Sequence, residues 1–387
     1  MQTPLHPSLT LFRDQFPLLN SRVYLANCSQ TPLAEPVRAA LAEGIRSWQE
    51  EGMDWERWMA EVERARESFA SLLGTTPANI AVGSSVSQLA SSVASALVAH
   101  APRQRILSSV LDFPGVAHAW LATRAYGWQV EIVETDEAGL VSLDRFASAS
   151  GPEVALLSAP HVVYTNGALL DLVRLADLAH AYGSLLFVDA YQSIGTLPID
   201  VEACDIDFLA AGVLKYLCGT AGIAFLYVHP RVQERLQPTV TGWFGRRNPF
   251  AFEPRQLDYA DSAARFDLGT PPVLNAYAAR AGIELVRAAD PAAIRERLLQ
   301  LSTLAMERSA RLGLTLSGPR EASAGGATTA IDAGSPERAH QLESALRQRS
   351  IMVSARGRLL RLAPHGFTQE EEVITALETI ARLLRAA

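Results

Sequence analysis

The sequence has few cysteines, and they are not clustered. Its three cysteines, Cys28, Cys204 and Cys218, are far apart in a chain of 387 residues and form no CxxC motif. A disulfide framework needs paired cysteines, and a zinc site needs closely spaced ones. The eight histidines show no metal-ligand spacing either. We therefore expect no metal site, and a reducing compartment.

The sequence also lacks an excess of basic residues and long apolar runs. Lys and Arg number 34 against 41 Asp and Glu, and the resulting net charge of −7 disfavours nucleic acid as a partner. The most apolar long stretch, residues 80–100, contains six serines and a glycine, and residues 1–20 lack the features of a signal peptide. These absences predict a cytoplasmic protein that does not bind membranes.

Between residues 75 and 230, short β-rich runs alternate with helical patterns. Several runs are continuously apolar, which is typical of strands buried on both faces of a parallel sheet. The pattern predicts an α/β fold with a doubly wound, mainly parallel seven-stranded sheet flanked by helices, and ligands at the carboxyl ends of the strands. The expected strands are Ile80–Val82, Arg105–Val110, Gln129–Val133, Val154–Ser158, Leu185–Asp189, Phe208–Ala210 and Ile223–Val228.

The pattern changes on both sides of this region. Residues 34–73 have a helical pattern, and beyond Pro271 long helical segments alternate with short β-like runs, as in an α+β unit with antiparallel strands. At roughly 100–200 residues per domain, a chain of this length should hold two domains. We predict a large α/β domain over residues 21–270 and a small α+β domain made of residues 1–20 and 271–387.

Common nucleotide-binding, zinc-protease and serine-hydrolase motifs are absent, so the chemistry must come from other residues. Asp189 ends the apolar run LLFVD, and Lys215 lies 26 residues later in AAGVLKYLCG. Desolvation lowers the pKa of a lysine and leaves an amine that can form a Schiff base. A buried carboxylate keeps a pyridine nitrogen protonated. Singly, Asp189 could cap a helix and Lys215 could lie on the surface, but together they suit pyridoxal phosphate.

Two segments then carry a resemblance to a known family. FVDAYQSIG (residues 187–195) and KYLCGTAGIAFLYV (residues 215–228) resemble the class V aminotransferase family of fold-type I pyridoxal phosphate enzymes. That family includes cysteine desulfurases, isopenicillin N epimerase-like proteins and kynureninases, and the likeness covers nearly the whole chain. It implies pyridoxal 5'-phosphate as the cofactor, an amino acid as the substrate, and a homodimer with active sites at the subunit interface.

The resemblance also implies a role for individual positions. Ser85 and Val86 would bind the phosphate, as the N–H groups and hydroxyls of a helix start can do, and Trp243 and Thr270 would reach it from the neighbouring subunit. Around the ring, the matching residues are Phe113, which would stack on it, and Asn166 and Gln192, on its O3′ side. Towards the substrate, they are Arg361, which would bind the α-carboxylate, and Asn27, in the N-terminal segment.

Departures from each subfamily bear on the reaction. A desulfurase needs a nucleophilic cysteine where this chain has residues 354–357, SARG. A kynureninase carries a tyrosine where Leu214 precedes the lysine, and a histidine in place of Gln192. We therefore predict an aminotransferase in which Lys215 forms the Schiff base and then moves the proton at the α-carbon. A kynureninase-like hydrolase, another carbon–carbon or carbon–sulfur lyase, and a non-catalytic cofactor-binding module are the alternatives.

Overall fold

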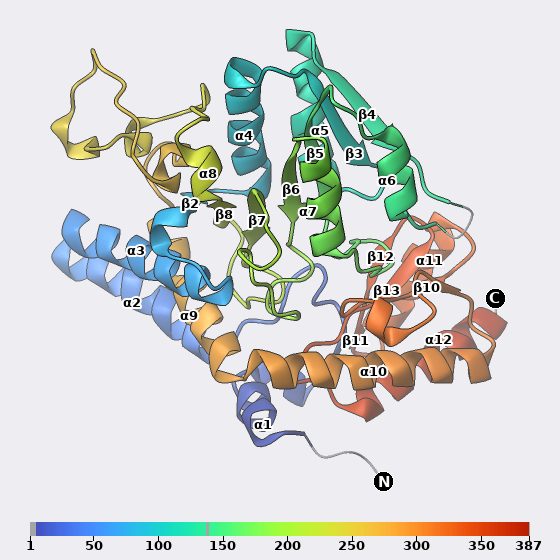
Figure 1. Ribbon diagram of the computed structural model, residues 1–387. Coiled ribbons are helices and arrows are strands. Elements are labelled where there is room, and N and C mark those ends of the chain that lie inside the picture. The colour runs from blue at the N-terminus through green and yellow to red at the C-terminus, as the bar shows by residue number, and fades with distance from the viewer. Residues whose placement is uncertain (1–4, 137–138, 387) are drawn as a thin grey trace.

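The computed structural model describes residues 5–136 and 139–386, and its largest feature is a seven-stranded sheet (Figure 1). Its strands are β2 (Ile80–Gly83), β3 (Arg105–Ser109), β4 (Gln129–Val133), β5 (Val154–Pro160), β6 (Leu185–Asp189), β7 (Phe208–Gly212) and β8 (Ala224–Val228). They lie in the order β2-β8-β7-β6-β5-β3-β4. Only β8 runs antiparallel to its neighbours in this described sheet. The predicted α/β fold with a mainly parallel sheet is confirmed.

Helices cover both faces of this sheet (Figure 1). One face is packed against α4 (Val86–His100), α5 (Pro114–Ala122) and α8 (Pro230–Gln233). The other is packed against α3 (Trp55–Leu72), α6 (Leu143–Ala149), α7 (Leu172–Ala181) and α9 (Val273–Ala288). The strands are almost fully buried between these layers, which is why their sequences are continuously apolar. Within residues 5–136 and 139–386, no helix is both long and apolar enough to cross a bilayer.

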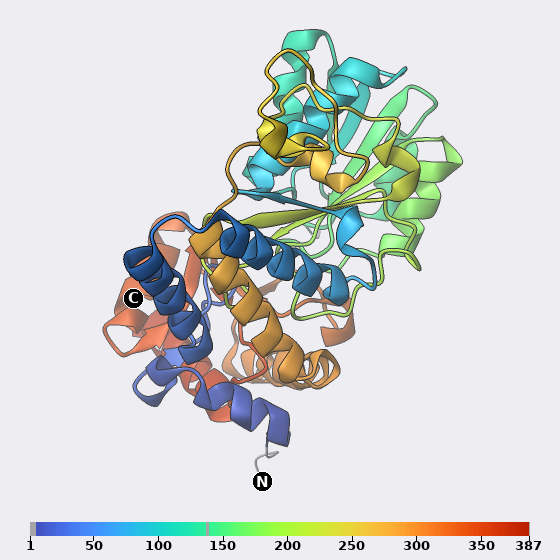
Figure 2. The same ribbon diagram turned by 90° about the vertical axis from the view of Figure 1, so that its left-hand side faces the viewer.

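A second, smaller part of the chain, drawn mainly in orange and red, lies beside the part that holds the large sheet (Figure 2). It contains a four-stranded antiparallel sheet in the order β12-β13-β10-β9 and a parallel pair, β1 with β11. The strands are β1 (Val23–Tyr24), β9 (Leu316–Ser317), β10 (Thr329–Asp332), β11 (Ile351–Met352), β12 (Ser354–Arg356) and β13 (Leu359–Leu362). The helices beside them are α1 (Pro7–Asp14), α10 (Pro291–Leu312), α11 (Pro336–Arg347) and α12 (Glu370–Ala386). The domain boundaries expected at residues 20 and 270 stay a prediction, and residues 1–4 and 387 lie outside the described residues.

Short 3₁₀ helices connect these elements. They are η1 (Pro17–Asn20), η2 (Pro77–Asn79), η3 (Thr123–Tyr126), η4 (Trp243–Gly245), η5 (Pro249–Ala251), η6 (Ala263–Phe266) and η7 (Ala322–Ala324). The last of them, η7, begins a loop that is hydrogen-bonded to the segment between β5 and α7. Leu169 N donates to Ala324 O (3.0 Å), and Gly326 N donates to Gly167 O (2.9 Å). The glycine-containing segment 323–327 is therefore tied down at both ends.

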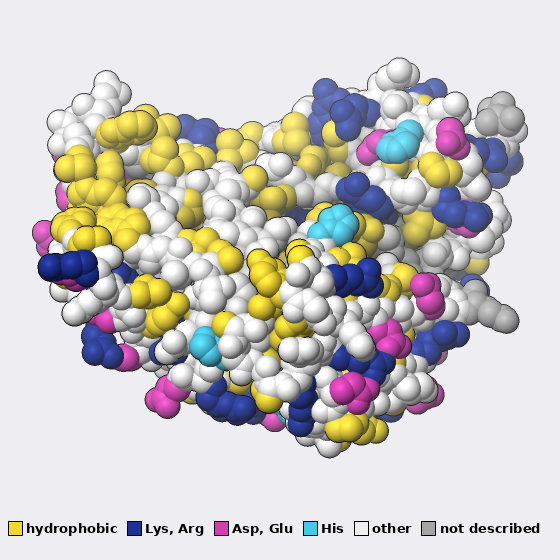
Figure 3. Space-filling view, turned by 90° about the horizontal axis from the view of Figure 1, so that it is seen from above, with side chains coloured by type: hydrophobic (Ala, Val, Ile, Leu, Met, Phe, Trp, Pro, Cys, Tyr) yellow, Lys and Arg dark blue, Asp and Glu magenta, His cyan; other side chains and the backbone are white. Residues whose placement is uncertain are grey.

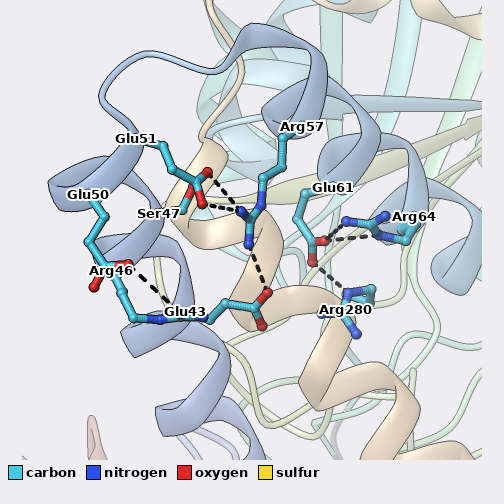
Figure 4. Close-up of polar contacts among 9 residues, drawn as sticks. All are labelled: Glu43, Arg46, Ser47, Glu50, Glu51, Arg57, Glu61, Arg64 and Arg280. Atoms are coloured by element: carbon cyan, nitrogen blue, oxygen red, sulfur yellow. Dashed lines mark hydrogen bonds and ion pairs between the residues drawn. The ribbon is translucent and has the colours of Figure 1, made fainter.

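The helical stretch expected over residues 34–73 is two helices, α2 (Glu35–Glu51) and α3. Gly52 ends α2 with φ +73°, and Asp54 starts α3 by accepting a hydrogen bond from Arg57 N (3.0 Å). Ion pairs hold the two helices and α9 together (Figure 4). Arg57 bridges Glu43 (3.2 Å) and Glu51 (2.8 Å) of α2. These helices belong to the layer that packs on the face of the large sheet opposite α4.

Candidate active site

A cavity of about 310 Å³ lies at the carboxyl ends of the central strands. Pro160, the last residue of β5, and Asp189, the last residue of β6, both line it. The small sheet closes it from the opposite side through Arg356 and Arg361. Seven residues that the sequence analysis singled out line this one cavity: Ser85, Val86, Phe113, Asp189, Gln192, Lys215 and Arg361.

Lys215 follows β7 and brings its amine into the cavity. Its backbone carbonyl accepts a hydrogen bond from Thr31 Oγ1 (2.5 Å), which holds the turn in place. Burial lowers the pKa of the amine to about 8, while the nearby charge of Asp189 acts in the opposite direction. The Nζ atom lies 4.1 Å from the ring centroid of Tyr191 and 5.6 Å from that of Phe113. The amine is therefore available as a nucleophile and a base near neutral pH.

Asp189 is buried at the end of β6, where it accepts a hydrogen bond from Tyr191 N (2.9 Å). Burial raises the pKa of its carboxyl, whereas the hydrogen bond from Tyr191 N and the Lys215 charge lower it. The carboxylate is thus held in a fixed position in a poorly solvated part of the cavity. A cationic ring N–H is a group that would compensate this buried charge.

Phe113 stands at the mouth of the cavity as the residue before α5, with 41 % of its surface exposed. The turn beneath it is organised by Asp112, whose carboxylate accepts hydrogen bonds from Ser109 Oγ (3.2 Å), Ser158 Oγ (3.3 Å) and the Ser108 hydroxyl. Burial raises the pKa of Asp112 to about 7. An exposed ring on such a supported turn offers a flat apolar face to a ligand.

The N-terminus of α4 forms another wall. Ser85 caps this helix by accepting a hydrogen bond from Gln88 N (3.2 Å), and Gln88 Oε1 accepts one from Ser84 N (2.7 Å). The first turn of α4 carries no acidic residue. Gly115 lets α5 approach closely, because a Cβ there would lie 2.5 Å from Ser87 Oγ. Free N–H groups and the hydroxyls of Ser85 and Ser87 at a helix start make an anion-binding surface.

Arg361 is the most deeply buried cation of the cavity, with 1 % of its surface exposed. Its guanidinium donates to Tyr164 O (2.8 Å), Ser29 Oγ (3.1 Å) and Ser354 Oγ (2.7 Å). Within the described part of the chain these partners are all neutral, and its Nε has no partner. A buried guanidinium with only neutral partners is a site for a carboxylate.

Gln192 and Asn27 differ in their relation to the cavity. Gln192 lines it, with Nε2 donating to Cys28 O (3.0 Å) and a buried Oε1 that has no partner among the described residues. Asn27 is fully buried and donates through Nδ2 to Ala363 O (2.8 Å). It does not line the cavity, whereas its neighbours Cys28 and Ser29 do. Asn27 therefore ties the N-terminal segment to the small sheet.

Asn166 does not reach this cavity either. Its Oδ1 accepts from Ala168 N (3.1 Å) and its Nδ2 donates to Gly139 O (3.4 Å), so the amide is used to shape the turn after β5. Tyr164, two residues earlier, lines the cavity instead and packs edge-on against Phe113 with ring centroids 5.2 Å apart. Tyr164 and Tyr191 were not among the residues expected at the site, because an aromatic residue near a strand end has no distinguishing pattern.

Trp243 and Thr270 also lie outside the Lys215 cavity, at the surface. Trp243 packs against Trp55, Phe250 and Phe252, with ring centroids 5.7–6.1 Å apart. Thr270 is exposed in the segment before α9. Their expected contact with a phosphate from a neighbouring subunit stays a prediction.

The cavity therefore combines an amine, a buried carboxylate, an aromatic face and an anion-binding helix start. Pyridoxal phosphate presents an aldehyde, a ring nitrogen, a flat ring and a phosphate, so the four kinds of group in the cavity match the four kinds in this molecule. The unpaired Oε1 of Gln192 and the unpaired Nε of Arg361, whose hydrogen-bond partners are all neutral, leave hydrogen-bonding capacity for a bound ligand. The residues present fit pyridoxal phosphate.

Comparison with known proteins decides the family. The model of the family described as aminotransferase class-V matches residues 23–365. This chain belongs to the class V aminotransferase family. An uncharacterized aminotransferase, YcbU, of Bacillus subtilis (strain 168) is 36 % identical over 370 residues, which cover 96 % of each chain. The kynureninase of Bacillus anthracis is 29 % identical over 333 residues, covering 82 % of this chain and 78 % of its own.

A solved structure agrees with this assignment at the level of the fold. The apo structure of a cysteine desulfurase from Thermococcus onnurineus NA1 superposes with a TM-score of 0.87 at 22 % identity, and all of both chains is covered. The family resemblance expected from residues 187–195 and 215–228 is confirmed, and so is the fold-type I architecture. As a class V aminotransferase family member, the protein is a pyridoxal phosphate-dependent enzyme.

Proposed function

We propose that this enzyme is an aminotransferase that removes the α-amino group of an amino acid, with Lys215 as its base. Among the described residues that line the cavity, Lys215 is the single amine, Asp189 the single carboxylate, and no histidine is present. Transamination moves one proton between two carbons and needs one base. Hydrolytic cleavage of a carbon–carbon bond needs a further group to activate water. Leu214 beside the lysine has no titratable group, and burial raises the pKa of the Tyr191 hydroxyl, which makes it a poor base for this purpose.

In the proposed mechanism, bound pyridoxal phosphate supplies an electron sink for the bond broken at the α-carbon. Arg361 binds the α-carboxylate with its guanidinium fork and thereby orients the α-carbon. Lys215 Nζ takes the proton from the α-carbon, for which its lowered pKa of about 8 is suited. When the cofactor is bound, Asp189 would hold the ring N–H, Gln192 would bind on the O3′ side, Phe113 would cover the ring, and Ser85 and the Val86 N–H would hold the phosphate.

A homodimer is part of the proposal. Hydrophobic side chains gather at one end of the molecule, over the segment that follows α8 (Figure 3). The exposed fractions there are 71 % for Phe252, 52 % for Leu257 and 45 % for Phe250, and Met53 at the end of α2 is 70 % exposed. Contiguous exposed apolar surface of this kind marks a protein interface. Trp243 belongs to this surface, which supports its proposed action across the subunit boundary.

The test is the visible absorption spectrum of the purified holoenzyme before and after the addition of single L-amino acids without any keto acid. We expect one amino acid to convert the yellow cofactor to its amine form stoichiometrically, and the Lys215→Ala variant to lose this conversion by at least about 10³-fold. Release of alanine from kynurenine with a persisting yellow band would instead favour the kynureninase-like hydrolase. Binding of the cofactor with no reaction towards any amino acid would favour a non-catalytic module.

A further inference from the structure

The cavity contains a cation that the proposed mechanism does not use. Arg356, at the end of β12, lines the same cavity as Lys215 and Arg361, and its side chain is exposed there. Among residues 5–136 and 139–386, it forms no ion pair. By contrast, Arg358, two residues further on, pairs with Asp332 at 2.7 Å, outside the cavity.

The register of the small sheet explains how Arg356 reaches the cavity beside Arg361. Ser354 of β12 lies directly opposite Arg361 of β13, and Arg356 lies opposite Leu359. Side chains two residues apart on a strand point to the same face, and so do directly opposed side chains. Arg356 is therefore the diagonal neighbour of Arg361 across the strand pair, and residues in this relation typically have their Cα atoms about 7–8 Å apart. The hydrogen bond from Arg361 to Ser354 Oγ (2.7 Å) confirms that this face is shared.

The cavity that contains Arg356 and Arg361 has more positive than negative side chains. The charged residues of the described cavity wall are Asp189, Lys215, Arg356 and Arg361, and Asp189 is assigned to the ring nitrogen. Like charges on neighbouring positions of a sheet repel each other unless an anion lies between them. The other described residues of the wall carry apolar, hydroxyl, thiol or amide side chains, so none of them supplies a carboxylate as counter-ion.

From this geometry we infer that the amino acid substrate carries a second carboxylate, which Arg356 binds while Arg361 binds the α-carboxylate. The inference rests on the proposed function, because it names the substrate class for the same site: an acidic amino acid of the glutamate or aspartate type. A guanidinium fork suits a carboxylate through two parallel hydrogen bonds. The same cations exclude basic amino acids, whose side chains would meet Arg356 as like charges.

The decisive experiment measures binding, so that it does not depend on turnover. Glutarate and pentanoate have the same carbon chain and differ by one carboxylate. Titration calorimetry of the holoenzyme should give a Kd for glutarate about tenfold or more below that for pentanoate, as one charge-assisted contact provides. Arg356→Gln should abolish this preference, and the matched control Arg358→Gln should keep it. Equal Kd values in the unmodified enzyme, or a preference that survives in Arg356→Gln, would overturn the inference.

Kinetics separate this inference from the proposed function. With L-glutamate and L-glutamine as isosteric donors, we expect Arg356→Gln to raise KM about tenfold for glutamate and by a clearly smaller factor for glutamine, whose neutral side chain forms no charge pair with Arg356. If glutarate binds selectively but no amino acid is converted, the aminotransferase proposal fails while the acidic subsite stands. If amino acids are converted without preference for glutamate or aspartate over their amides, the subsite fails and the aminotransferase proposal stands.

Discussion

The amine of Lys215 and the carboxylate of Asp189 influence each other across one cavity. Burial pushes the lysine towards its neutral form, and the aspartate charge partly restores the cation. The result is a pKa of about 8 instead of the ordinary 10.5. The sequence predicted this pair, because both residues lie in or beside apolar runs. The residues that surround it, Tyr191 and Tyr164, could not be predicted, because their approach depends on how distant segments pack.

This electrostatic balance predicts a pH dependence for the capture of pyridoxal phosphate by the cofactor-free enzyme. Only the neutral amine of Lys215 attacks an aldehyde. The capture rate should therefore rise about tenfold per pH unit below 8 and level off above it. Asp189→Asn should move the midpoint below 8, because the Asp189 charge raises the Lys215 pKa. Stopped-flow absorbance against pH measures both midpoints.

The surface variant Asp261→Asn is the control for this experiment, because Asp261 pairs with Arg247 at the surface, outside the cavity. Its midpoint should equal that of the unmodified enzyme. A midpoint near 10.5 in the unmodified enzyme would show that burial does not lower the Lys215 pKa, and an unchanged midpoint in Asp189→Asn would show that the Asp189 charge does not raise it.

At the scale of elements, the seven expected strands coincide with β2 to β8 to within two residues at every end. Buried parallel strands are recognisable because both of their faces must be apolar. The break between α2 and α3 was not predicted, although Gly52 and Asp54 are ordinary helix-stop and helix-start residues. The turn shows only in the tertiary structure, where α2 and α3 each pack on α9.

The contact between α3 and α9 gives a prediction for stability. Glu61 is fully buried and pairs with Arg64 of its own helix and with Arg280 of α9 (Figure 4). Glu61→Ala should lower the free energy of unfolding by about 2–3 kcal/mol, because Arg280 keeps only its pair with Glu284. Guanidinium chloride unfolding followed by circular dichroism measures it. Glu50→Ala, in an exposed pair on α2, should leave the midpoint unchanged, and equal effects of both variants would refute a special role for Glu61.

For the whole molecule, the exposed aromatic surface around Phe252 and Trp243 predicts association of two copies. Sedimentation velocity should show a dimer for the unmodified enzyme. Phe252→Glu should dissociate it into monomers, because a carboxylate would lose its hydration at an apolar interface. Tyr126→Glu is the matched control, since Tyr126 is 70 % exposed and Phe252 is 71 % exposed, and it lies on η3, apart from this surface. A monomeric unmodified enzyme with full activity would refute the proposed dimer.

The sequence by itself determined the properties that depend on neighbouring residues. Apolar runs specify strands buried on both faces, and the placement of Asp189 and Lys215 after such runs specifies a cofactor with a ring nitrogen and an aldehyde. The tertiary structure decided which side chains meet. The strand register places Arg356 beside Arg361, and the turn after β5 brings Tyr164 into the cavity while it uses the Asn166 amide for its own shape. Such contacts join segments far apart in the chain, so they follow from packing and register and not from local pattern.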